Sequence, residues 1–170
     1  MSAAVQISLG EYLSSEYEPD CDYVDGVLEE RNVGLRRHSR TQVLLSGWLL
    51  ARESSHGYRV LIVERVKVSA TRVRIPDICL VSPDDRDELT ERPPVLWIEV
   101  VSSDDRWSRI QTRLADCTTF GVPMIWIVDP YTKQAWTITG AAGAVPVTDG
   151  ILRYPELGLE VPLQEILPED

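Results

Sequence analysis

The chain has 170 residues, 44% of them hydrophobic and 26% charged, which is enough for one domain with a sizeable core. Its formal net charge of −10 repels nucleic acid as a global field, so any nucleic-acid binding requires a local basic face. No segment reaches the roughly 20 apolar residues of a membrane span, and the N-terminus lacks the pattern of a signal peptide. We therefore predict a single domain over residues 1–170, soluble, cytoplasmic and without a membrane partner.

The first forty residues predict a short helix, a hairpin and a basic entrance to a longer helix. Ser8 is the expected N-cap of a helix over residues 8–15, and Asp25-Gly26 is a strong signal for the turn of a hairpin. The basic entrance comprises Arg31, Arg36, Arg37, His38 and Arg40. Two interpretations stay open for it: a contact with nucleic-acid phosphates, or a solvated loop that offsets nearby acids.

The middle of the chain alternates helical and strand-like patterns. A core helix is expected over about residues 39–55, with an apolar stripe that includes Val43, Trp48 and Leu50. Two or three consecutive strands follow over residues 58–82, and another strand covers residues 95–102. Asp104 or Asp105 is the expected N-cap of the next helix, which ends at Phe120 with Gly121 behind it.

That second helix carries an apolar stripe of Trp107, Ile110, Leu114 and Cys117, with Arg109 and Arg113 on one flank. After it, residues 123–129 read as a buried strand and residues 133–140 as its edge partner. The segment 95–128 is thus a β-α-β unit with parallel strands. The expected fold class is α/β (α+β): a central mixed sheet flanked by helices. The cysteines, Cys21, Cys79 and Cys117, lie far apart and outside any CxxC motif, and should be reduced and buried.

Two carboxylates stand inside segments that otherwise read as buried strands. Ile75, Ile78 and Leu80 surround Asp77, and Trp97, Ile98 and Val100 surround Glu99. A buried ionised carboxylate is expensive unless it is paired, hydrogen-bonded or bound to a metal. The functional interpretation is a seat for a hard divalent cation, which prefers oxygen ligands. The alternative is that each acid pairs with an arginine or accepts backbone N–H bonds.

These residues carry a resemblance to a known family. The ordered set consists of YVDG at 23–26, His38, Pro76-Asp77, Glu99-Val100-Val101-Ser102, FGVP at 120–123 and Asp129-Pro130. In this order they resemble the Uma-type branch of the PD-(D/E)XK restriction-endonuclease-like superfamily, over about residues 8–138. The resemblance implies a central mixed sheet of about four strands flanked by helices, and a Mg²⁺-dependent nuclease centre in which Mn²⁺ can also serve.

Carried over position by position, the resemblance assigns Asp77 and Glu99 as metal-binding acids, with the backbone carbonyl of Val100 as a further ligand. Asp22 takes the place of a family glutamate, and Arg113 takes the place of the family lysine. An arginine keeps its proton near neutral pH, so Arg113 is suited to stabilise charge but not to act as a general base.

Two functions from different classes follow. The first is a metal-dependent nuclease with Asp77, Glu99, Arg113 and Asp22 as catalytic residues, and with Arg36, Arg37, His38 and Arg40 contacting nucleic acid, DNA rather than RNA. The second is an inactive protein of the same fold that binds nucleic acid or protein. A structural domain whose acids are satisfied by Arg109 and Arg113 is a third interpretation, and a homodimer is compatible with each of them.

Overall fold

The computed structural model describes residues 6–32, 34–140 and 142–169. Its helices are α1 (Leu9–Leu13), α2 (Arg36–Leu50), α3 (Glu53–His56), α4 (Trp107–Phe120) and α5 (Leu163–Ile166), with a 3-10 turn at Pro155–Leu157. Its strands are β1 (Cys21–Val24), β2 (Val27–Glu30), β3 (Arg59–Ile62), β4 (Val66–Ser69), β5 (Arg72–Arg74), β6 (Ile78–Val81), β7 (Leu96–Val100), β8 (Met124–Asp129), β9 (Gln134–Thr139), β10 (Val145–Pro146), β11 (Ile151–Tyr154) and β12 (Leu159–Pro162).

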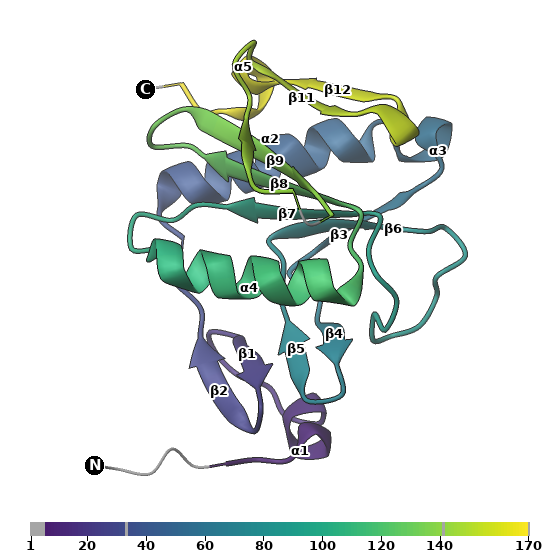
Figure 1. The fold of residues 1–170 in the computed structure, drawn as a ribbon, viewed down its shortest axis with the longest axis vertical. Coiled ribbons are helices and arrows are strands. Elements are labelled where there is room, and N and C mark those ends of the chain that lie inside the picture. Colours follow the sequence, from purple (N-terminus) through teal and green to yellow (C-terminus); the bar gives the residue numbers. More distant parts are fainter. Residues whose placement is uncertain (1–5, 33, 141, 170) are drawn as a thin grey trace.

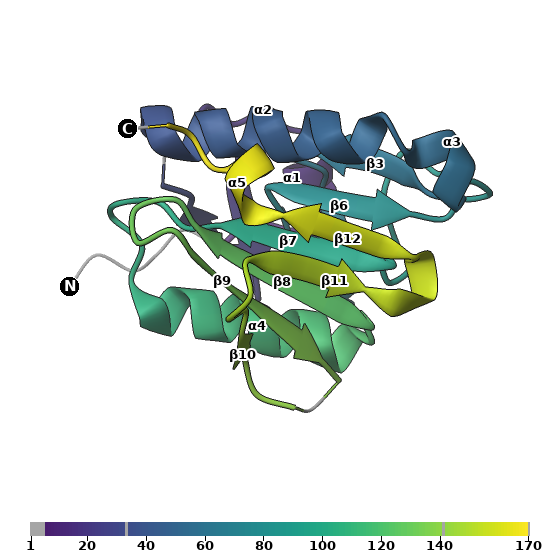
Figure 2. The ribbon, with the colours of Figure 1, turned by 90° about the horizontal axis from the view of Figure 1, so that it is seen from above.

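A six-stranded mixed sheet forms the centre, with the order β10-β9-β8-β7-β6-β3. Strands β7 and β8 are parallel and are joined through α4, as the β-α-β pattern predicts, and the other neighbours are antiparallel. In Figure 2 the sheet lies between α2 on one side and α4 on the other. The expected α/β class, a mixed sheet flanked by helices, is therefore confirmed.

The strands divide their side chains between two apolar layers because successive residues alternate between faces. Ile98 and Trp126 pack in the cluster with Leu45 and Leu49 of α2. Trp97 lies on the opposite side, in the cluster that contains the α4 stripe. This alternation matters for the site, because a residue of β7 faces α2 or α4 according to whether its position is even or odd.

A second sheet with the order β2-β1-β5-β4 stands below the main sheet in Figure 1, with α1 beside it. Ser8 caps α1 as expected, because its Oγ accepts the amide of Glu11 at 3.1 Å. Asp25 and Gly26 form the predicted hairpin turn with φ values of 50° and 93°. The segment 58–82 contributes four strands rather than two or three, and these strands divide between the two sheets.

The expected helix over residues 39–55 is wrong at both ends and on its apolar face. Helix α2 starts at Arg36 and stops at Leu50, and α3 is a separate turn. Val43 and Leu50 are 61% and 60% exposed, whereas His38, Thr41, Leu45 and Leu49 are buried. The packing of α2 on the sheet determines which of its residues are buried, and it leaves Val43 and Leu50 exposed to solvent.

Three further expectations need correction. Arg106, not Asp104 or Asp105, is the N-cap of α4, and Asp105 instead accepts the amide of Ser102 at 2.8 Å. Trp107 is 49% exposed because it stands in the first turn of α4, whereas Ile110, Leu114 and Cys117 are buried. Strand β9 is not the edge, since the two-residue β10 pairs with it.

The three cysteines are buried and free, as predicted. In the described part of the chain, no helix is long and apolar enough to cross a membrane.

Candidate active site

The two strand carboxylates face the same side of the main sheet. Asp77 immediately precedes β6, and the antiparallel pairs Ile78↔Ile98 and Cys79↔Trp97 bring it opposite Glu99 when the register is continued. Residues directly opposite in such a pair project to one face. Glu99 has the parity of Trp97, which faces α4. Both acids are buried, with 5% and 2% of their surface exposed.

Three groups surround the Asp77 carboxylate. Its Oδ1 accepts from Arg31 Nη2 at 3.1 Å, and its Oδ2 accepts from the amide of Val100 at 2.8 Å and lies 3.4 Å from Nε2 of His38. Burial favours the neutral acid, but the bond to His38 and the charges of Arg31 and His38 outweigh it, and the pKa of Asp77 falls below its usual value. Burial lowers the pKa of His38, yet its contact with Asp77 raises it overall.

The Glu99 carboxylate has a different environment. Its Oε1 accepts from Nε1 of Trp97 at 2.8 Å, and its Oε2 lies 3.1 Å from Arg113 Nη2. Burial raises the pKa of Glu99 to about 7; Arg113 opposes this rise and Asp77 adds to it. The charge of Glu99 in turn raises the pKa of Arg113. The expected proximity of Arg113 to the strand acids is thus present in the structure.

Asp22 belongs to a neighbouring ion-pair network. Its Oδ2 accepts from Arg74 at 3.0 Å and its Oδ1 from the amide of Ile75 at 3.1 Å. The fully buried Arg74 also pairs with Glu29 at 2.7 Å and Asp116 at 2.8 Å. Burial raises the pKa of Asp22, against the charges of Arg113 and Arg74. This network ties the small sheet to α4.

Two small cavities open beside these groups. One of about 10 Å³ is lined by Arg31, Asn32, His38, Asp77, Ser102, Asp105 and Arg113. The other, of about 20 Å³, is lined by Asp22, Glu29, Glu30, Arg31, Asn32, Asp105, Arg109 and Arg113. The first is near the smallest volume that can hold one water molecule. Both are lined in part by residues just before or within the first turns of α2 and α4, and these two helices begin on the left of Figure 1.

The oxygen ligands of this site suit Mg²⁺, whereas the positive charges around them do not. Mg²⁺ binds proteins through one or two carboxylates and keeps several waters, and Glu99 Oε2 is a buried acceptor without a hydrogen bond. Against this, Arg31, Arg113 and His38 already offset both acids. Within the described residues, no group of three or more His, Cys, Asp and Glu side chains is placed to hold a metal. The fit therefore rests on two carboxylates, a backbone carbonyl and water.

The basic entrance of the sequence divides into two parts. His38 lies on the buried side of α2 and contacts Asp77, whereas Arg36, Arg37 and Arg40 are exposed. The three exposed arginines line a separate cavity of about 740 Å³ with Leu44 and the C-terminal residues Gln164, Glu165, Leu167, Pro168 and Glu169. This wide groove lies between α2 and the segment from α5 to Glu169, whereas Asp77 lines the smaller cavity of about 10 Å³.

Sequence reasoning did not assign Arg31 to the site. It follows the last residue of β2 and reaches a carboxylate 46 positions away. Its only signal in the sequence was its membership of a basic run. Pairing with Asp77 depends on how the small sheet docks against the main sheet, which no local pattern encodes.

A family model and one solved structure match most of this chain. A sequence model of the Uma2 family, described as "Putative restriction endonuclease", matches residues 9–168. A crystal structure described as a "putative nuclease belonging to DUF820" from Anabaena variabilis superposes with a TM-score of 0.83 at 18% identity, over 94% of this chain and 97% of that one. A DrdV–DNA complex matches with a TM-score of 0.41 at 20% identity, over 62% of this chain and 9% of that one. A comparison with curated proteins found no match.

Proposed function

The chain belongs to the Uma2 family, and on this premise we propose that it is a Mg²⁺-dependent nuclease, also able to use Mn²⁺, that hydrolyses phosphodiester bonds of nucleic acid. The observation that carries the proposal is the pair of buried carboxylates, Asp77 just before β6 and Glu99 in β7, which project side by side from one face of the main sheet. A protein core holds two such acids together only where partners stabilise them. We take residues 1–170 as one restriction-endonuclease-like domain with this single centre.

Asp77, Glu99 and the backbone carbonyl of Val100 would hold the ion. When bound, Mg²⁺ polarises a phosphate oxygen and lowers the pKa of a bound water. His38 positions Asp77 through their 3.4 Å contact and keeps this acid ionised. Asp22 contributes through water, because its own oxygens are already held by Arg74 and the amide of Ile75.

Arg113 supplies the fixed positive charge of the site. It lies 3.1 Å from Glu99, and the charge of that acid keeps its guanidinium protonated at every working pH. A preorganised cation in an enclosed site stabilises negative charge that develops on a phosphate during hydrolysis. Because Arg113 accepts no proton, the proton of the attacking water would pass to the solvent.

Nucleic acid would approach along the start of α2. Arg36, Arg37 and Arg40 are exposed there on successive turns and line the same wide groove. They supply the local basic face that a chain of net charge −10 needs. His38 lies on the same helix as these arginines, but its side chain contacts Asp77. DNA is the proposed substrate.

The direct test is cleavage of single- and double-stranded DNA and RNA with Mg²⁺ or Mn²⁺. Wild-type protein and Arg113→Lys should cut, while Asp77→Ala, Glu99→Ala and Arg113→Ala should lose most activity. Calorimetric titration of the metal should show heat with wild type and none with Asp77→Ala. Wild-type protein that binds neither ion and cuts none of the four substrates would end the nuclease proposal.

A second function, binding of nucleic acid without cleavage, is favoured by one observation. Each acid already has a guanidinium partner, Arg31 for Asp77 and Arg113 for Glu99, so the charge of a metal is in part replaced. In that case no variant cleaves, and substitution of Arg36, Arg37 or Arg40 by Gln weakens binding and flattens its salt dependence.

A further inference from the structure

Three polar atoms around the smaller cavity are buried without a hydrogen-bond partner. They are Nε of Arg31, Nε of Arg113 and Oγ of Ser102, and all three residues line the cavity of about 10 Å³. Ser102 is 5% exposed, and both arginine side chains are 14% exposed. A buried donor without an acceptor destabilises the protein, and native structures rarely leave one so. Three at one cavity indicate an acceptor that belongs there.

The cavity selects an acceptor of small size and negative charge. Its volume of about 10 Å³ is near the lower limit for one water molecule, so it admits a single oxygen atom and no larger group. Each guanidinium carries five N–H donors, and in the structure one nitrogen of each contacts a carboxylate. The remaining N–H groups can therefore donate to a second anion while the contacts with Asp77 and Glu99 persist. Guanidinium groups match phosphate geometry and form strong charge-assisted bonds with it.

Neighbouring residues hold the mouth of this cavity in place. The side-chain amide of Asn32 donates to Oδ1 of Asp105 at 2.9 Å, and the other oxygen of Asp105 accepts the amide of Ser102 at 2.8 Å. This chain of contacts links the segment after β2 with the loop before α4. It orders the segments that carry Arg31 and Ser102 without using Nε of Arg31 or Oγ of Ser102.

We propose that Arg31 is a substrate-binding residue: together with Arg113 and Ser102 it binds one non-bridging oxygen of a nucleic-acid phosphate, and it does so without a metal. The inference rests on the proposed function, which supplies the phosphodiester as ligand. It adds a residue and a mode of binding, since the phosphate is held before any ion arrives. Arg31 then links Asp77 to the substrate, one guanidinium serving both.

The experiment measures binding of a fluorescent single-stranded DNA oligonucleotide by anisotropy in EDTA, over a series of salt concentrations. Wild-type protein should bind in EDTA. Arg31→Gln should weaken binding by about tenfold, since a charge-assisted hydrogen bond is lost, and lower the slope of log K against log salt by about 1. Arg31→Lys should restore the slope and part of the affinity. Arg59→Gln, which removes the same charge from the exposed strand β3, is the matched control and should leave the slope unchanged.

Circular dichroism accompanies each variant, so that only folded protein is compared; Arg31→Lys retains a positive partner for Asp77 if Arg31→Gln unfolds. Equal affinity and slope in Arg31→Gln and Arg59→Gln would overturn the inference, and so would the absence of binding by wild-type protein in EDTA. If Arg31→Lys folds and Arg31→Gln does not, the inference is overturned when Arg31→Lys binds with the affinity of Arg59→Gln and an unchanged salt slope. Cleavage with Mg²⁺ is scored separately. If wild-type protein cleaves and Arg31→Gln does not change binding, only the proposal for Arg31 is refuted. If binding depends on Arg31 and no protein cleaves, only the nuclease proposal is refuted.

Discussion

Replacement of Asp77 by Asn tests whether its ion pairs stabilise the fold. The carboxylate is 5% exposed and accepts from Arg31 at 3.1 Å and from the amide of Val100 at 2.8 Å, with His38 at 3.4 Å. Asparagine keeps the size and one acceptor oxygen. It removes the charge, however, and turns an NH₂ group toward one of the three donors.

The expected magnitude follows from opposing effects. Breaking a buried ion pair costs about 3–5 kcal/mol, and this cost already includes the loss of the hydrogen bond from the charged donor. Relief of the repulsion toward Glu99, whose pKa Asp77 raises, offsets about 1 kcal/mol. Asp77→Asn should therefore lower the free energy of unfolding by about 2–4 kcal/mol at neutral pH, and the melting temperature by roughly 10 °C.

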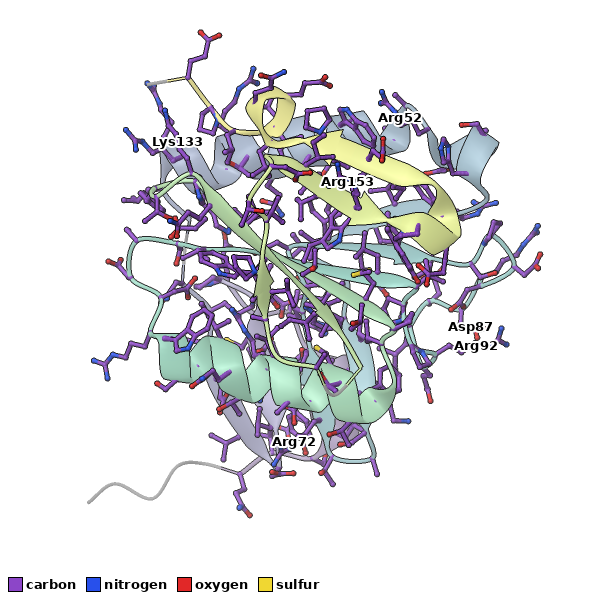
Figure 3. All side chains as sticks on the ribbon, turned by 45° about the horizontal axis from the view of Figure 1, so that its top comes forward. Arg52, Arg72, Asp87, Arg92, Lys133 and Arg153 are labelled. Carbon is purple, nitrogen blue, oxygen red and sulfur yellow. The ribbon has the colours of Figure 1, made fainter. Side chains whose placement is uncertain are left out.

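Urea unfolding followed by circular dichroism in EDTA measures this difference, and pH supplies an internal check. The pKa of Asp77 is below its ordinary 3.8, so the stabilisation is present above the unfolded value and disappears as pH falls through the folded one. The two proteins should converge in acid. Asp87→Asn makes the same chemical change on the exposed loop between β6 and β7, labelled in Figure 3, and should be neutral. An Asp77→Asn protein at least as stable as wild type would refute the reasoning, because it would mean that the cationic partners do not offset the repulsion between the two acids.

Three other outcomes are expected. Arg74→Met leaves Asp22 buried without its partner and should lower the free energy of unfolding by about 3–5 kcal/mol in a urea titration. The pKa of Glu99 is raised from 4.5 to about 7, so between these pH values the native state holds a proton that the unfolded chain releases. The free energy of unfolding should therefore fall by about 3 kcal/mol as pH rises from 4.5 to 7. Glu99→Gln should abolish this pH dependence in unfolding titrations. Gly121 ends α4 with φ 99°, so Gly121→Ala should lower the melting temperature through a loss of about 1 kcal/mol or more, measured against Gly47→Ala in mid-helix α2 as a control that is not destabilising.

The sequence predicts the main sheet well because its strands are marked locally. The runs around Ile78, Ile98 and Ile127 are apolar and β-branched, and turn residues bound each of them. The β-α-β unit then fixes parallel pairing of β7 and β8. Asp77 and Glu99 project from the same face of the sheet because their strands are adjacent and the two residues occupy opposite positions in the register. The motif resemblance points to the same pair of acids.

Other parts of the fold depend on contacts that no local pattern encodes. Val63 adopts φ 53°, a value rare for a β-branched residue, and this turn ends β3 and sends the chain into the small sheet. A valine in a run of valines predicts a continuous strand, so the division into two sheets was missed. The outward rotation of Val43 and Leu50 on α2 is similar, because packing of the whole helix against the sheet decides it.

The chemistry of the site is least visible in the sequence, because it depends on which cations reach the acids. Arg113 stands on the same helical flank as Arg109, yet only Arg113 contacts Glu99 among the ion pairs of the described residues. Arg31 arrives from the small sheet and offsets Asp77. Two acids offset by two guanidinium groups form a site that is nearly neutral before any ion binds, so Mg²⁺ gains less Coulomb attraction here than at bare carboxylates. A phosphate bound to the remaining donors of Arg31 and Arg113 adds negative charge to the site while both ion pairs persist, and metal affinity should then rise with substrate bound. Binding of the ion and of the phosphate would thus be cooperative, and by linkage each would strengthen the other by the same factor.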